Sequence, residues 1–104
     1  MKVHKWNAET DGPLSETGLI NKLEKMGYRC TRYTYPRGTY FPDHSHSDDK
    51  IDAVLKGEFK ISMSGKSVLL NAGDYVFVPK GEVHSAEVVG NESVVSIDAI
   101  KNEI

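Results

Sequence analysis

The chain has 104 residues, of which 38% are hydrophobic and 27% charged, with 13 lysines and arginines against 15 aspartates and glutamates. This length suits one domain with one core, and the near balance of charge gives no bias toward nucleic acid or membrane surfaces. The apolar runs are far shorter than the ~20 residues of a spanning helix, and the first residues lack a signal peptide's apolar segment. We therefore expect one soluble cytoplasmic domain over residues 1–104, without nucleic-acid or membrane partners.

Residues 1–27 are predicted to form an N-terminal arm followed by one amphipathic helix. The arm ends in a turn at residues 10–13, and Trp6 is expected to anchor it by packing. Ser15 or Thr17 can cap the helix, and Gly27 marks its C-terminal end. We expect the helix to cover an apolar surface of the domain or to lie in a dimer contact. Its apolar face would consist of Leu19, Ile20, Leu23 and Met26.

Residues 28–104 are predicted to form a β-barrel. Residues 28–35 are rich in aromatic and β-branched side chains, and short strand-like segments follow, separated by turn residues. Within residues 59–63, apolar and polar side chains alternate, which is typical of a strand with one buried face. Seven or eight short strands indicate an all-β sandwich or barrel rather than a parallel α/β fold. The later strands are expected near residues 40–46, 51–55, 59–63, 67–70, 75–78, 83–89 and 94–99.

Three of the four histidines form a candidate metal site. His44 and His46 are two residues apart, so an extended backbone puts both imidazoles on one face, with Cα atoms roughly 6.5 to 7 Å apart. His84 lies downstream, just after a Pro-x-Gly turn that can bring it back to the same face. Three neutral imidazoles would bind a divalent ion and leave positions open for water or substrate.

The order of these residues resembles the two sequence motifs of the cupin superfamily. The first motif, G-x5-H-x-H-x3-4-E-x6-G, is matched in part by Gly38, His44, His46 and Gly57. The second motif, G-x5-P-x-G-x2-H-x3-N, is matched by Gly73, Pro79, Gly81 and His84. The motifs cover residues 38–88, and the flanking strands extend the resemblance over about residues 28–100.

The resemblance implies an all-β double-stranded β-helix, the cupin or jelly-roll barrel, after one N-terminal amphipathic helix. It implies a divalent transition metal (Fe, Mn, Ni or Zn) bound by His44, His46 and His84, a small-molecule ligand or substrate, and a homodimer. Cupins include dioxygenases, isomerases and decarboxylases, and the fold does not select among them. An enzyme of the oxygenase or isomerase type, a non-catalytic binding module and a metal-free barrel all remain open.

Lys50 departs from the family pattern, because it stands where the first motif has a metal-binding glutamate; Val88 replaces the final asparagine of the second motif. An ammonium in place of a carboxylate makes the site more positive by two units, which disfavours a divalent cation and favours anionic ligands. Three interpretations of Lys50 remain open: it turns aside from the metal, it pairs with Asp52, or it acts in the cavity as an anion-binding group or base. We favour the Lys50–Asp52 ion pair beside a three-histidine metal. Asp52, or otherwise Asp48 or Asp49, is a candidate fourth ligand.

The alternation of side chains along strands marks further pocket residues. Tyr40 precedes His44 by four residues on the same face, and Tyr75 and Phe77 share a face of a later strand. These aromatics are expected to wall a pocket or to fill the barrel, and Tyr40 and Lys50 are the candidates for catalysis. Cys30 lacks a catalytic or metal-binding signature and is expected to be structural.

We predict that Lys50→Glu raises the affinity for a divalent metal, because the substitution restores the carboxylate of the family motif. Calorimetric titration of both proteins with Mn²⁺ or Zn²⁺ measures the difference. Unchanged or weaker affinity would mean that another group already fills the position.

Overall fold

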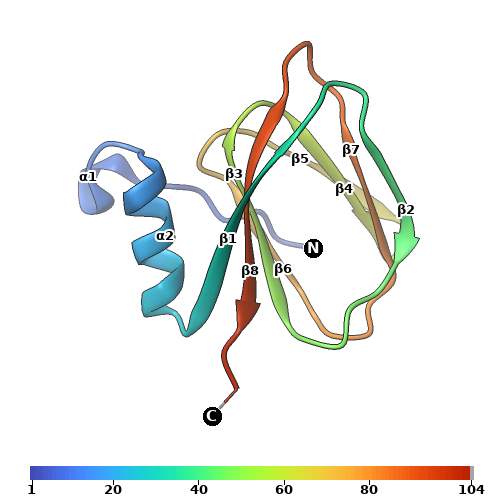
Figure 1. Ribbon diagram of the computed structural model, residues 1–104, viewed down its shortest axis with the longest axis horizontal. Coiled ribbons are helices and arrows are strands. Elements are labelled where there is room, and N and C mark those ends of the chain that lie inside the picture. Colours follow the sequence, from blue (N-terminus) through green and yellow to red (C-terminus); the bar gives the residue numbers. More distant parts are fainter. Residues whose placement is uncertain (104) are drawn as a thin grey trace.

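Two four-stranded antiparallel sheets face each other in the computed structural model, which describes residues 1–103 (Figure 1). One sheet has the strand order β1-β8-β3-β6 and the other has the order β2-β7-β4-β5. The chain crosses repeatedly between the sheets, and the predicted all-β double-stranded β-helix is confirmed. The strands are β1 (Tyr28–Tyr35), β2 (Tyr40–His44), β3 (Lys50–Lys56), β4 (Phe59–Met63), β5 (Lys66–Leu70), β6 (Tyr75–Val78), β7 (His84–Val88) and β8 (Val94–Lys101).

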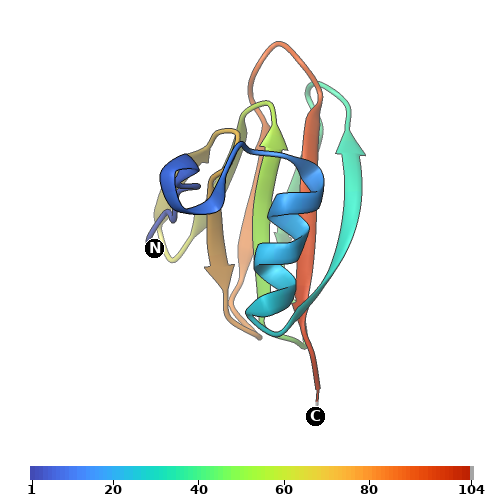
Figure 2. The same ribbon diagram turned by 90° about the vertical axis from the view of Figure 1, so that its left-hand side faces the viewer.

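The predicted amphipathic helix is α2 (Glu16–Lys25), which lies across the outer face of the β1-β8-β3-β6 sheet (Figure 2). Ser15 is its N-cap, with its hydroxyl oxygen accepting the N–H of Gly18 at 3.0 Å. Leu19 and Leu23 are fully buried against the sheet, so the helix covers an apolar surface as expected. Neither helix within residues 1–103 is long and apolar enough to cross a membrane.

The N-terminal arm contains a short helix, α1 (Ala8–Asp11), which the sequence analysis missed. Asn7 caps it, because the Asn7 side chain accepts the N–H of Glu9 at 2.9 Å. An asparagine before an acidic first turn is a helix-start signal, but four residues are too few to show a helical period.

Trp6 anchors the arm as predicted, and Gly73 makes the contact possible. The N–H of Trp6 donates to the carbonyl of Gly73 at 3.0 Å, and the arm pairs with β6 through His4 and Tyr75. Gly73 has φ +90°, and a Cβ there would lie 2.8 Å from the Cβ of Trp6. Glycine at this position of the second motif therefore permits both the left-handed turn and the close approach of the arm.

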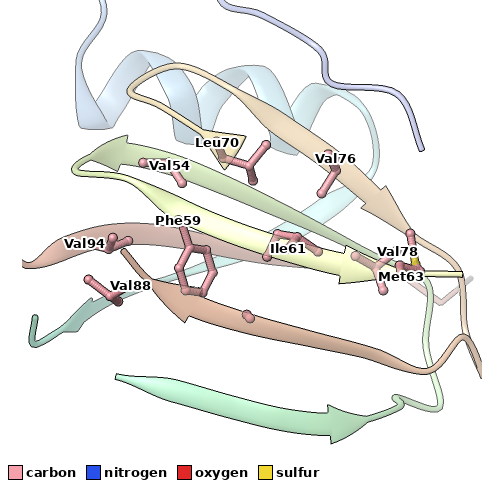
Figure 3. Close-up of a cluster of buried hydrophobic side chains, with 10 residues drawn as sticks. Val54, Phe59, Ile61, Met63, Leu70, Val76, Val78, Val88 and Val94 are labelled. Carbon is pink, nitrogen blue, oxygen red and sulfur yellow. The ribbon is translucent and has the colours of Figure 1, made fainter. Parts of the chain in front are cut away.

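The β1-β8-β3-β6 sheet packs on both faces. Its outer face carries Ile51, Ala53 and Ile97 under α2, whereas Val54 and Val94 point between the two sheets. Figure 3 shows the inner apolar cluster, in which Phe59, Ile61 and Met63 of β4 meet side chains of neighbouring strands. Because side chains alternate along β3, Lys50 and Asp52 share the inner face with Val54.

We predict that Gly57→Ala destabilises the fold much more than Gly65→Ala. Both glycines have positive φ, which costs alanine roughly 1–2 kcal/mol. Only at position 57 would a Cβ also meet backbone, at 2.7 Å from the carbonyl oxygen of Ser93, whereas nothing lies within 4 Å at Gly65. Urea unfolding followed by circular dichroism measures the two losses, and equal losses would contradict the packing explanation.

Candidate metal centre and cavity

A cavity of about 450 Å³ opens between the two sheets. The β2-β7-β4-β5 sheet and its loops contribute the histidines, and the opposite sheet contributes Lys50 with two carboxylates. The lining residues are Tyr33, Tyr35, Phe41, Pro42, Asp43, His44, His46, Lys50, Asp52, Phe59, His84, Ala86 and Asp98.

The three histidines come together from two neighbouring strands and one loop. His44 ends β2 and His84 begins β7, and the two residues are direct partners in the antiparallel pairing. His46 follows in the loop between β2 and β3. One potential ligand nitrogen from each ring lies within 4.8 Å of the others, so the group can hold a metal ion. In the described part of the chain this group does not include Asp52.

The Pro-x-Gly turn positions His46 through the backbone. The N–H of Gly81 donates to the carbonyl of His46 at 2.8 Å, and the N–H of Lys80 donates to the Asp49 carboxylate at 2.9 Å. These bonds tie the loop after β2 to the loop before β7. The carboxylate of Asp49 thus connects the two loops by a hydrogen bond, although the sequence also allowed it to be a metal ligand.

Hydrogen bonds fix the tautomers of two of the histidines. The Nδ1–H of His44 donates to the carbonyl of Pro42 at 2.7 Å, and that of His84 donates to the carbonyl of Glu82 at 2.9 Å. Both Nε2 atoms therefore keep a free lone pair, as in metal sites where carbonyls orient the ligand rings. The Nε2 of His46 is buried and has no hydrogen-bond partner among residues 1–103. A buried nitrogen without a partner costs stability unless it has a ligand to bind.

The surroundings of His46 and His84 favour the neutral imidazole. Burial is the main cause that lowers the pKa of each ring, and the Lys50 ammonium lowers both further. Only the neutral ring can bind a metal through its lone pair. The electrostatic environment is therefore compatible with metal binding near neutral pH.

The ammonium of Lys50 forms two ion pairs at the wall opposite the histidines. Its Nζ lies 2.6 Å from Oδ1 of Asp98 and 3.7 Å from Oδ1 of Asp52. The predicted Lys50–Asp52 pair is therefore present, but Asp98 is the nearer partner. Asp52 and Asp98 face each other directly across β3 and β8. A glutamate at position 50 would meet these carboxylates without a compensating cation.

Asp52 holds its proton more tightly than an ordinary aspartate. Burial raises the pKa of Asp52 to about 7, with the Lys50 ammonium opposing this shift and the neighbouring Asp98 carboxylate adding to it. Two carboxylates beside one ammonium readily retain a proton between them. The group formed by Lys50, Asp52 and Asp98 thus carries a net charge between minus one and zero.

The sequence model of the cupin domain family matches residues 31–100. The chain belongs to the cupin family. The oxalate-binding protein of Thermotoga maritima is 33% identical over 92 residues, which cover 88% of this chain and 73% of that protein. A crystal structure of a predicted oxalate decarboxylase from Thermotoga maritima is 29% identical, with a TM-score of 0.65. The match covers 80% of this chain and 74% of the chain in that crystal structure.

A further relative matches a shorter stretch of the sequence. The dimethylsulfoniopropionate lyase DddQ of Ruegeria pomeroyi is 39% identical over 51 residues, which cover 48% of this chain but 25% of the lyase. Its crystal structure has a TM-score of 0.66 at 25% identity. The relatives differ in what their names say they do, so the shared family does not by itself select an activity.

Three aromatic residues expected in the pocket of this cupin lie elsewhere. Tyr40 is 60% exposed, because a register shift between Phe41 and His44 breaks the simple alternation along β2. Tyr75 and Phe77 lie on the outer face of β6, where His4 stacks on Tyr75 at 5.0 Å and meets the edge of Phe77. They neither wall the cavity nor fill the barrel interior, so the expectation was wrong for all three.

The aromatic residues that do line the cavity were not predicted from the sequence; they are Tyr33, Tyr35, Phe41 and Phe59. Asp98 was not predicted either. The alternation of Phe59, Ile61 and Met63 indicated a buried face, and the same reasoning applied to β1 would have placed Tyr33 and Tyr35 together. Asp98 lay on a predicted strand, but only the register between β3 and β8 reveals that it faces Asp52.

Cys30 has the structural role expected from the sequence. It packs beside the layer under α2, and burial raises the pKa of its thiol to about 11. The thiol is therefore protonated at neutral pH and a poor nucleophile.

We predict that Asp52→Asn stabilises the metal-free protein increasingly as pH rises from about 4 to 7. The folded state holds the Asp52 proton more tightly than the unfolded chain, so its stabilising contribution is complete below pH 4 and is lost as pH rises through 7. The lowered pKa values of His46 and His84 make stability rise with pH instead, but they affect the wild-type protein and the variant equally. Urea unfolding in EDTA at several pH values measures the difference, and a difference independent of pH would contradict the assignment.

Proposed function

We propose that this cupin binds a divalent transition metal through His44, His46 and His84 and holds a small organic molecule in the adjoining cavity. The observation that carries the proposal is the buried Nε2 of His46, which lacks a hydrogen-bond partner in the described chain. It lies in a group whose potential ligand atoms are all within 4.8 Å of one another. Three neutral nitrogen donors suit Fe, Mn, Ni or Zn alike.

The metal, when bound, supplies a Lewis acid that attracts the oxygen atoms of a ligand. The carbonyls of Pro42 and Glu82 hold the rings of His44 and His84 in orientation. On the opposite wall, the ammonium of Lys50 offers hydrogen-bond donors, and its partners Asp52 and Asp98 offer carboxylate acceptors. The aromatic side chains reduce the water in the remaining volume.

Binding without catalysis is the second candidate function. The favouring observation is the likeness to a protein named for binding oxalate, which covers most of this chain. The likeness to a lyase covers about half of the chain and favours an enzyme less strongly. Whether the bound molecule reacts, and by an oxygenase or isomerase route, stays a prediction, as do the homodimer and the cytoplasmic location.

We predict one divalent ion per chain after purification without a metal-affinity column, and its loss in His84→Ala. Removing one of three ligands lowers affinity by about 10-fold or more, as even loss of a second-sphere partner can. Metal content by elemental mass spectrometry and Zn²⁺ affinity by calorimetry are the measurements. His4→Ala is the matched control, since His4 stacks on Tyr75 outside the cavity.

Circular dichroism of each variant separates loss of metal from loss of fold. A folded wild-type chain that binds no divalent ion would refute the metal proposal and favour the metal-free barrel. Equal losses in His84→Ala and His4→Ala would place the metal elsewhere.

A further inference from the structure

We infer that the ligand of this cupin is a monoanionic organic acid with a ring-sized apolar group, and that Phe41 selects for that group. The inference rests on the proposed function, because the metal would bind the acid group. It goes further by excluding small dianions such as oxalate as the preferred ligand.

An aromatic wall, formed by Tyr35, Phe41 and Phe59, lines one side of the cavity. The ring centroid of Tyr35 lies 4.9 Å from that of Phe41 and 5.7 Å from that of Phe59. Phe41 and Phe59 meet edge to face at 6.3 Å. These contacts hold the rings as one continuous apolar surface, which an apolar group would remove from water favourably.

The aromatic wall continues toward the solvent through Tyr33. Its ring stacks on that of Tyr35 at 5.9 Å, and the residue is 44% exposed. Phe59 at the other end is only 3% exposed. The wall thus runs from an exposed aromatic residue to a buried one, which provides an extended contact for a ring that enters the cavity.

The charges of the cavity disfavour a second carboxylate on the ligand. Lys50 is the one lysine or arginine among the described residues that line it, and two carboxylates already pair with that ammonium. Asp43 adds a further acidic group to the lining. A dianion would therefore have no unpaired lysine or arginine for its second charge, whereas a monoanion needs only the metal.

The cavity volume also suits a larger molecule. About 450 Å³ lies within the range of roughly 300–1,000 Å³ that is typical of small-molecule sites. A bare dicarboxylate would leave much of the aromatic wall in contact with water. An acid carrying a phenyl group would reach both the histidines and the wall.

Calorimetry on the Mn²⁺-loaded protein tests the inference, with 3-phenylpropanoate, propanoate, succinate and oxalate as probes. We expect 3-phenylpropanoate to bind at least about 10-fold more tightly than propanoate, because a phenyl ring buries a large apolar area. We also expect it to bind more tightly than either dianion. Metal content is measured after each titration, so that extraction of Mn²⁺ by oxalate is not counted as binding.

Phe41→Leu should reduce the preference for 3-phenylpropanoate over propanoate by about 3- to 10-fold, the usual scale of an aromatic pair. Tyr40→Leu is the matched control, because it removes the neighbouring aromatic ring on β2 but lies outside the cavity. It should leave the preference unchanged. Unchanged metal content and thermal unfolding in both variants ensure that the comparison concerns the ligand.

The inference is overturned if oxalate or succinate binds more tightly, if the ring gives no advantage, or if no probe binds the loaded protein. Equal effects of Phe41→Leu and Tyr40→Leu would also overturn it. Failure of the protein to bind Mn²⁺ or Zn²⁺ would instead refute the proposed metal site. The two failures are therefore distinguishable.

Discussion

The cavity depends on the burial of the Lys50 ammonium between two carboxylates. Lys50 is 7% exposed, and its Nζ contacts Asp98 at 2.6 Å. Burying such a group costs several kcal/mol in desolvation, and the ion pairs compensate only when their geometry is good. An apolar side chain would fill the same position at lower cost. The ion-paired group determines the charge that any metal or ligand in the cavity would meet.

The spacing of the histidines and glycines was sufficient to predict the barrel and the three histidines that come together in the candidate metal centre. Gly57 and Gly73 have a local reason for their identity, namely positive φ, so they leave a clear trace in the sequence, whereas their close contacts with Ser93 and Trp6 come from distant parts of the chain. The Pro-x-Gly turn likewise acts locally, although its hydrogen bond to the carbonyl of His46 becomes visible only in three dimensions. Motifs of this kind are readable because each residue serves a nearby geometric requirement.

The walls of the cavity were predicted less well, because they depend on strand register. Counting by twos from His44 placed Tyr40 inside, but the irregular pairing between Phe41 and His44 puts Phe41 there instead. A shift of one residue reverses which side chains face the core. Tyr75 and Phe77 were correctly put on one face of β6, but choosing the face required knowing where α2 and the arm pack. Asp98 is opposite Asp52 only through pairing of β3 with β8.

The replacement of the usual glutamate by Lys50 is thus compensated in charge by Asp52 and Asp98, and Asp98 lies outside both motifs. With both carboxylates ionised, Lys50, Asp52 and Asp98 carry the same net charge of minus one as a single glutamate. The charge that would balance a metal is retained, but it is moved from a direct ligand to the opposite wall. The histidine group includes no carboxylate among the described residues, so the oxygen ligands of the proposed metal would come from water or from the bound molecule. In the proposed site, the bound molecule would therefore supply the oxygen ligand that the motif glutamate otherwise provides, and the aromatic wall lines the same cavity.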